Sequence, residues 1–505
     1  MIHSAVIEGV PVRWADQPGR FSASLVFRAG VRDETFATAG ITHLVEHLAF
    51  SGIPVPDHAH NGEVKLGITE FMFEGTPEEV AESLAAICGS LSALAEGRVD
   101  EQQLARERAV LEAEGVTSPV PPEMAEALSN HYGLIGPGLA AVDEKYLDRL
   151  TAADVAKYAA GYFTRGNAVL VCSAAPPEGL RLPLPEGPRR PLLDADRVGA
   201  STPAEYVSGG TKVVLSFRIP GDHNDAAAAT PLVQQALERR IHEGLRRRDG
   251  LVYGADCYGV TVDDRSALLV ATIDVAPRNA AESARRVVDE LRNLRDTGLT
   301  PEEVRRSTAR LASDRAEPES AQGDAYQAAV AELCGQRPWL LADFAAALET
   351  YTPALTTALL ADLDTTLLVG LPEEAIPDDV NAATGVVFPP RRTQERAEVQ
   401  GKVYKRGLLA RFAGAPADAR LVVGQAGVEL TLLGETTAMP WEAIVGLERE
   451  PFDAGVEGIT LYTRDAFQFA FLSAWFRRGE EAVTRIRAAV PERLQFLTAP
   501  DGNSN

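Results

Sequence analysis

The amino-acid sequence predicts an α+β protein of two homologous domains followed by a small β-barrel-like domain. Three observations carry this prediction. Strand-like and helix-like segments follow a similar order in residues 1–180 and 204–372, proline-rich linkers separate the units, and residues 402–497 change to short strands with one final helix. At 505 residues the chain is also too long for a single hydrophobic core.

The composition and net charge of the chain argue against some classes of function. Apolar residues make up 45% of the chain and charged residues 24%, an ordinary balance for a globular protein. The net charge of −23 argues against nucleic-acid or anionic-membrane binding by the surface as a whole. The four cysteines are scattered, and neither a targeting leader nor a membrane-spanning run is recognisable. We therefore expect a cytoplasmic protein with no membrane span and no nucleic-acid partner.

The first domain, residues 1–180, alternates strand-like and helix-like segments. Its expected elements are strands at 5–13 and 21–28, a helix at 40–50, a Pro/Gly loop at 51–65, a strand at 65–74, helices at 77–95, 100–114 and within 122–162, and a strand at 168–173. Residues 176–203 are rich in proline, which predicts a linker.

The second domain, residues 204–372, repeats the order of the first. Lys212–Arg218 echoes Ser22–Arg28 as a strand. Gly97–Leu104 and Thr297–Val304 each open a helix after a short polar turn, with Asp or Thr as the cap and acids in the first turn. We interpret this pattern as an internal duplication.

The helix expected at 40–50 carries the pattern His-x-x-Glu-His. On a helix, His43 and His47 share one face a turn apart, so both imidazoles can reach one zinc ion. Glu46 projects toward the same side and can take a proton from a water that the metal activates. The alternative is a core helix that happens to carry two histidines, although apolar burial of Glu46 would then be costly. The second domain lacks the pattern, so we expect at most one zinc site per chain.

A catalytic zinc site needs a third protein ligand and an open position. The helix after the motif offers Glu107 and Glu114, which lie seven residues apart on one face, whereas Glu112 points elsewhere. His58 and His60, in the preceding loop, are rival ligands. The residues alone leave this choice open, because a solvated acidic helix face is an ordinary outcome.

The tail, residues 402–497, follows a second linker at about 372–401. Its short alternating strands and final helix predict a small β domain that folds as its own unit. The alternating Phe467, Phe469 and Phe471 are expected to face inward together.

One stretch of the tail, Met439-Pro-Trp-Glu-Ala-Ile444, resembles the strand entry of pleckstrin-homology-like (PH-like) domains. Such a module contacts a lipid, a protein partner or only the clamshell. Because the basic residues of the tail are scattered along the sequence, we expect contact with a protein.

The motifs of the first domain resemble the pitrilysin/insulinase family of zinc peptidases, the inverzincins, and in particular its two-domain, processing-peptidase-like branch. The resemblance rests on Gly40-Ile-Thr-His-Leu-Val-Glu-His-Leu-Ala-Phe50 and on Arg106-Glu-Arg-Ala-Val-Leu-Glu-Ala-Glu114. It implies that Glu114 is the third zinc ligand and Glu107 a supporting carboxylate. It covers about residues 1–372 and not the tail.

The second domain adds Leu245-Arg-Arg-Arg-Asp-Gly-Leu-Val-Tyr253, which is similar to an Arg/Tyr element of the same family. This resemblance implies that Arg246 and Tyr253 reach the zinc site of the facing domain and stabilise the developing oxyanion. The sequence departs from the family in a shorter interval between His47 and Glu114, so we expect a more open or differently selective cleft.

The resemblance implies a clamshell of two metalloprotease halves with Zn2+ as the cofactor. The expected activity is that of a zinc metalloendopeptidase acting on unfolded peptides or leader segments, with Glu46 as general base. The expected partners are a peptide substrate and a second chain, in a homodimer or a heterodimer with a related protein. Two alternatives remain: a catalytically inactive processing-peptidase-like partner subunit, and a binding scaffold that works through its C-terminal module.

Overall fold

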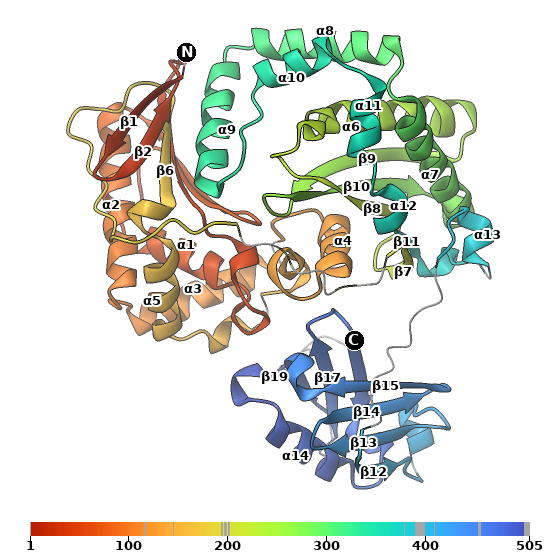
Figure 1. The fold of residues 1–505 in the computed structure, drawn as a ribbon. Helices are drawn as coiled ribbons and strands as arrows, with labels where there is room; N and C mark the ends of the chain where they lie inside the picture. Colours follow the sequence, from red (N-terminus) through yellow and green to blue (C-terminus); the bar gives the residue numbers. More distant parts are fainter. Residues whose placement is uncertain are drawn as a thin grey trace.

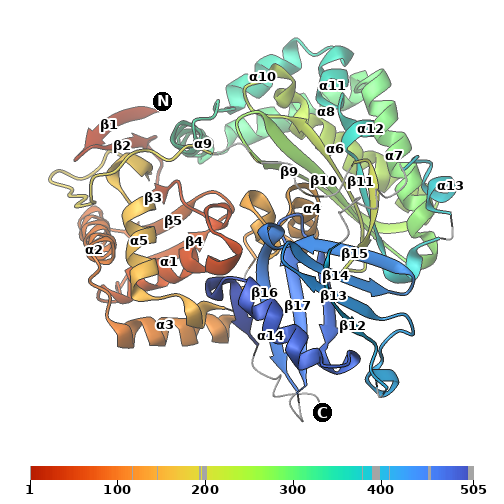
Figure 2. The ribbon, with the colours of Figure 1, turned by 60° about the horizontal axis from the view of Figure 1, so that its bottom comes forward.

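Two mixed α+β units lie side by side, and a smaller β-rich module lies against them (Figures 1 and 2). The computed structural model describes residues 2–498 apart from 116–117, 145, 193–194, 196–198, 200–201, 378, 389–398, 409 and 453–455. The expected α+β class with two similar units is confirmed. No helix in these described ranges is long and apolar enough to cross a membrane.

The first unit is built on a six-stranded sheet with the order β1-β2-β6-β3-β5-β4. Its strands are β1 (His3–Ile7), β2 (Val10–Trp14), β3 (Phe21–Phe27), β4 (Ala59–Val64), β5 (Thr69–Gly75) and β6 (Ala168–Cys172). Its helices are α1 (Ile41–Ser51), α2 (Pro77–Ala95), α3 (Glu101–Glu114), α4 (Pro122–Tyr132) and α5 (Ala152–Tyr162). Apolar side chains of α1, α2, α3 and α5 bury one face of the sheet in a single core.

The second unit is built on a five-stranded sheet with the order β7-β11-β8-β10-β9. Its strands are β7 (Ala204–Ser208), β8 (Val213–Pro220), β9 (Val252–Thr261), β10 (Ser266–Val275) and β11 (Leu368–Pro372). Its helices are α6 (Thr230–Arg240), a π-helical turn (Ile241–Arg248), α7 (Ala280–Thr297), α8 (Pro301–Ala316), α9 (Ser320–Cys334), α10 (Leu341–Glu349), α11 (Pro353–Leu359), α12 (Leu363–Thr366) and α13 (Val380–Thr384). A second core lies between this sheet and α6 and α7.

The helix starts that suggested a duplication form as expected. The Asp100 carboxylate accepts hydrogen bonds from the first turn of α3. Thr300 caps α8 in a capping box, in which its hydroxyl accepts from the Glu303 N–H and the Glu303 side chain accepts from the Thr300 N–H. In each case a glycine at positive φ, Gly97 or Gly298, ends the preceding helical segment.

Two expectations for the first unit were wrong. Residues 5–13 form a hairpin rather than one strand, because Glu8 and Gly9 take left-handed backbone angles and reverse the chain between β1 and β2. The expected loop at 51–65 contains β4, and the following strand begins at Thr69 rather than at residue 65. Pairing of β4 with β5 supplies hydrogen bonds that the local composition does not predict.

One helix of each unit packs on the sheet of the other unit. Helix α4 of the first unit packs on Val214 and Val270 of the second sheet. Helix α9 of the second unit packs on Val26 and Val169 of the first sheet. The two units therefore cannot separate without exposing an apolar sheet face on each side.

The C-terminal module contains two four-stranded sheets, β12-β13-β14-β15 and β18-β17-β16-β19, closed by α14. Its elements are β12 (Gly401–Lys405), β13 (Arg420–Gly424), β14 (Gly427–Leu432), β15 (Glu435–Pro440), β16 (Ile444–Pro451), β17 (Glu457–Thr463), β18 (Gln468–Leu472), α14 (Gly479–Ala489) and β19 (Gln495–Leu497). The module has its own buried core. Phe469 and Phe471 join that core, but the expectation that Phe467 does so is wrong: it lies in the turn before β18 and is 39% exposed.

The module packs directly on the first unit. Phe36 and Tyr146 of the first unit share an apolar cluster with Tyr462 and Phe496 of the module. The rings of Tyr146 and Phe496 stack with their centroids 4.0 Å apart, and those of Phe36 and Tyr462 lie 5.0 Å apart. Gly446 of β16 completes the contact, because an added methyl group there would lie 2.3 Å from Phe36 Cε1. The tail is thus a docked domain with its own core.

We predict that Gly446→Ala weakens this docking. The Phe36 ring is held among other rings and cannot easily retreat, so overpacking should cost about 1–3 kcal/mol. Gly407→Ala, in the same module, is the matched control, since its methyl group would meet no atom closer than 3.7 Å. Limited proteolysis should release the module faster from the Gly446 variant only, and equal rates for both variants would contradict the packing described.

Candidate metal centre

The start of α1 is fixed by a buried carboxylate. Glu34 accepts hydrogen bonds from the N–H groups of Gly40 and Thr42, both at 2.9 Å. Gly40 takes a left-handed conformation with φ of 88°, and the Thr42 hydroxyl lies 2.7 Å from the Tyr158 hydroxyl. Burial raises the pKa of Glu34 to about 8, against the opposing effect of these hydrogen bonds. The helix start is therefore anchored from outside the helix.

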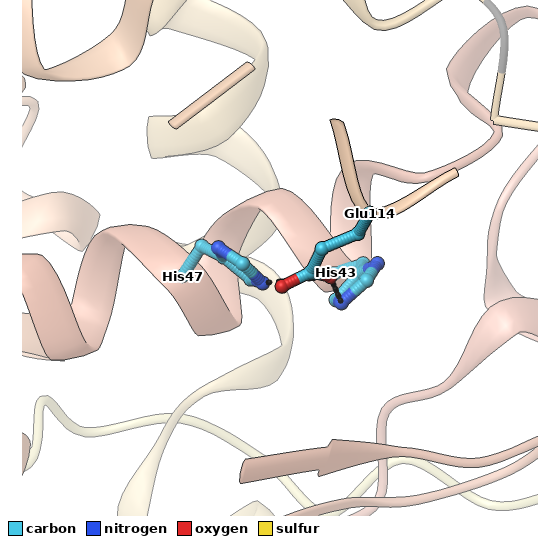
Figure 3. A group of neighbouring side chains, drawn as sticks. All are labelled: His43, His47 and Glu114. Carbon is cyan, nitrogen blue, oxygen red and sulfur yellow. Dashed lines mark ion pairs between the residues drawn. The ribbon is translucent and has the colours of Figure 1, made fainter. Parts of the chain in front are cut away.

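Three potential metal ligands converge beside this helix. His43 and His47 project from α1, and Glu114, the last residue of α3, points between them (Figure 3). Glu114 Oε2 lies 3.8 Å from His43 Nε2 and 3.7 Å from His47 Nε2. The three ligand atoms all lie within 4.8 Å of one another.

The donor set fits zinc. Bonds of about 2.1 Å at tetrahedral angles place ligand atoms roughly 3.4 Å apart. The two separations from Glu114 are within a few tenths of an ångström of this value, and the two imidazoles, which lie within 4.8 Å of each other, would have to approach to bind one ion. Two imidazoles and one carboxylate are also a catalytic zinc set that leaves a fourth position open.

Two further carboxylates hold the outer nitrogens of the histidines. His43 Nδ1 lies 3.0 Å from Glu144 Oε2, and His47 Nδ1 lies 3.5 Å from Glu107 Oε2. Such contacts orient both Nε2 atoms toward Glu114. Burial lowers the pKa of His47, with the charge of His43 as the next cause. Burial also acts to lower the pKa of His43, but the bond to Glu144 and nearby carboxylates outweigh it, so that pKa is raised.

Glu144 was missed by the sequence reasoning. It lies 101 positions from His43, in a segment with no recognisable motif, so no local spacing could have indicated the contact. It also lines a cavity of about 420 Å³ between α4 and the start of α1.

Glu46 is buried against the edge of the sheet. It is 7% exposed, and its Oε2 lies 3.7 Å from His47 Nε2. Burial raises the pKa of Glu46 to about 7, and Glu114 and Glu107 add to this effect. A methyl group added to Gly62 of β4 would lie 1.7 Å from Glu46 Oε1, so only glycine leaves room for the carboxylate as it lies here.

The rival ligands lie elsewhere. His58 Nε2 contacts the Ser83 hydroxyl at 3.0 Å, and His60 Nδ1 contacts the His58 carbonyl at 3.0 Å. Glu112 is exposed on α3. Within the described part of the chain, the group formed by His43, His47 and Glu114 includes none of them.

Arg246 and Tyr253 contact each other rather than the metal centre. The Arg246 guanidinium lies 5.2 Å from the centre of the Tyr253 ring. Arg246 is exposed in the π-helical turn and Tyr253, in β9, is 73% exposed. No contact among the described residues joins this pair to His43, His47 or Glu114, so their expected role stays a prediction.

Comparison with known proteins identifies a matching family model and solved structures of similar fold. The family described as "Peptidase M16 inactive domain" matches residues 149–311, which are mainly the second unit. No curated protein matches the sequence.

Solved structures agree on the architecture. A protease from Helicobacter pylori is 15% identical with a TM-score of 0.57, over 73% of this chain and 98% of its own. A chain of complex III2 from Candida albicans is 15% identical with a TM-score of 0.59, over 76% and 99%. Pitrilysin is 14% identical with a TM-score of 0.60, over 75% and 45%. At this identity the likeness establishes a shared two-domain fold alone and leaves family and activity open.

We predict that Glu144→Gln weakens zinc binding about 10–100-fold, because the amide is a poorer acceptor for the His43 Nδ1–H. Glu112→Gln is the matched control, since it removes one carboxylate from the exposed side of α3. Competition with a chromophoric chelator measures the affinity. Equal affinities in the two variants would mean that Glu144 does not orient His43.

Proposed function

We propose that the chain is a zinc metallopeptidase that hydrolyses unfolded peptides or leader segments. The observation that supports this most is the convergence of His43, His47 and Glu114 around one point with Glu46 beside it. A purely structural helix would gain nothing from four carboxylates (Glu46, Glu107, Glu114 and Glu144) and two imidazoles in one half-buried cluster, since most of them must be desolvated. We further propose a cytoplasmic location.

Each residue of the cluster has a defined task in this proposal. Zinc held by His43, His47 and Glu114 would polarise the scissile carbonyl and acidify a water molecule. Glu46 would accept the proton of the attacking water and return it to the leaving amine. Glu107 would keep His47 oriented during this exchange.

Strand β4 offers a binding edge for the peptide. It is the last strand of its sheet, among the described residues it pairs with β5 and with no other strand, and Gly62 brings it against Glu46. An extended peptide that adds to this edge would run past the proposed base, and its backbone rather than its side chains would supply most of the contacts.

A second function is favoured by a separate observation. Arg246 and Tyr253 face solvent without reaching the candidate metal centre, the family match carries the description "inactive domain", and one structural relative is a chain of complex III2. These facts support a catalytically inactive partner subunit or binding scaffold. In either case we propose a homodimer or a heterodimer with a related chain, in which the Arg/Tyr pair contacts the other protomer.

We predict that Glu46→Gln retains zinc and loses peptide cleavage, because an amide cannot accept the proton of the attacking water. Glu114→Ala should instead lose the metal. Metal analysis of each purified variant and digestion of an unbiased peptide library measure the two effects. A Glu46→Gln protein that cleaves at the wild-type rate would exclude this mechanism, and a wild-type chain that binds zinc but cleaves nothing would favour the inactive alternative.

We also predict that Arg246→Ala and Tyr253→Phe each lower kcat about 10²-fold with little change in KM, as expected for a lost oxyanion donor. The exposed neighbour Arg247→Ala is the matched control. Zinc content should stay at the wild-type level in all three. An unchanged kcat in both test variants would show that the second unit is only structural.

A further inference from the structure

One short segment of the first unit touches both the candidate metal centre and the C-terminal module. The residues concerned are Glu144, Tyr146, Leu147 and Arg149, which we call the bridging segment. Glu144 Oε2 lies 3.0 Å from His43 Nδ1. Two residues further along the chain, the Tyr146 ring stacks on Phe496 of the module, with the ring centroids 4.0 Å apart. The contact that orients a potential zinc ligand is thus next to a contact between domains.

The first unit holds the bridging segment against the start of α1. Leu147 is buried in the same core as the apolar side chains of α1. A methyl group added to Gly40, the residue before α1, would lie 2.7 Å from Leu147 Cδ2 and 3.1 Å from Glu144 Cβ. The segment therefore packs closely on the residue at which the helix begins. A shift of the segment would move the Glu144 carboxylate relative to His43.

The module holds the bridging segment from the other side. Tyr146 is 5% exposed and Phe496 is 1% exposed, so the stacked rings are shielded from water. The Arg149 guanidinium lies 5.4 Å from the centre of the Phe496 ring and donates to the Glu492 carbonyl at 3.2 Å. Because stacked rings prefer a narrow range of arrangements, this contact favours one position of Tyr146.

The other carboxylate that holds α1 has a similar neighbour. Phe36 lies two residues after Glu34, which accepts the N–H groups at the helix start. The Phe36 ring centroid lies 5.7 Å from that of Phe496 and 6.4 Å from that of Tyr146. Without the docked module, both rings of the first unit would lose the apolar partner that covers them.

We propose that docking of the C-terminal module is required for full zinc affinity, with Tyr146 as the positioning residue. The stack of Tyr146 on Phe496 fixes the bridging segment and, with it, Glu144. Glu144 in turn keeps His43 Nε2 directed toward Glu114. This inference rests on the zinc site of the proposed function and extends it, because the tail becomes a part of the metal centre. It does not depend on whether the site cleaves peptides.

The test measures the zinc affinity of the full-length protein by competition with a chromophoric chelator. Tyr146→Leu and Phe496→Leu each remove the ring stack and keep a large apolar side chain. Each should weaken zinc binding about tenfold, the lower end of the effect of losing the partner of a metal-binding histidine. Tyr146→Phe keeps the ring and should bind zinc like wild type. The visible absorption of Co2+-substituted protein reports ligand geometry and should change in the two Leu variants only.

A double-mutant cycle separates positioning from loss of stability. In a Glu144→Gln background, Tyr146→Leu should cause no further loss of zinc affinity, since both changes act through the same contact to His43. Phe217→Leu is the matched control, because it replaces a fully buried ring in the core of the second unit. It should lower the melting temperature and leave zinc affinity unchanged.

Three results would overturn the proposal in a chain that binds zinc. They are equal affinities of wild type and both Leu variants, equal weakening by Phe217→Leu, and an undiminished effect of Tyr146→Leu in the Glu144→Gln background. A wild type that binds no zinc would overturn the zinc site itself together with this coupling. Peptide cleavage is not a readout, so affinity losses in the Leu variants of a chain that cleaves nothing would still support the coupling.

Discussion

The candidate metal centre depends on how the start of α1 is held. Glu34 binds the first N–H groups of the helix, and Glu144 binds the outer nitrogen of His43. Successive helical residues are rotated by about 100°, so a start displaced by one residue would turn both histidines away from Glu114. The capping carboxylate lies before the helix, and Glu144 lies far beyond it. The site is therefore a product of the packed unit and not of the motif alone.

The C-terminal module contributes to this same region. Tyr146, two residues after Glu144, stacks on Phe496 of the module, and Phe36, two residues after Glu34, packs against Tyr462. Both anchors of α1 thus lie beside residues that the module buries. A domain that has its own core is therefore coupled by packing to the shape of the candidate metal centre.

The two units are joined by apolar packing as well as by a linker. Helices α4 and α9 are exchanged between the sheets, so the apolar face of each sheet is completed by the other unit. Arg246 and Tyr253 lie on an exposed surface of the second unit. The role proposed for this pair therefore requires either movement of the units or a second protomer.

The sequence by itself determined the features that depend on local spacing. The His-x-x-Glu-His spacing places both imidazoles on one face of α1, the seven-residue interval places Glu107 and Glu114 on one face of α3, and the caps at Asp100 and Thr300 form as expected. Helical geometry and capping act within a few residues, so a single chain segment contains all the information they need.

Only the tertiary structure decided the rest, because it depends on contacts between distant segments. β4 exists through its pairing with β5, although its composition is typical of a loop. Glu144 reaches His43 from 101 residues away, and Phe467 turns outward because a tight turn delays the start of β18. Burial and pairing of remote segments settle such positions, and no local pattern encodes them.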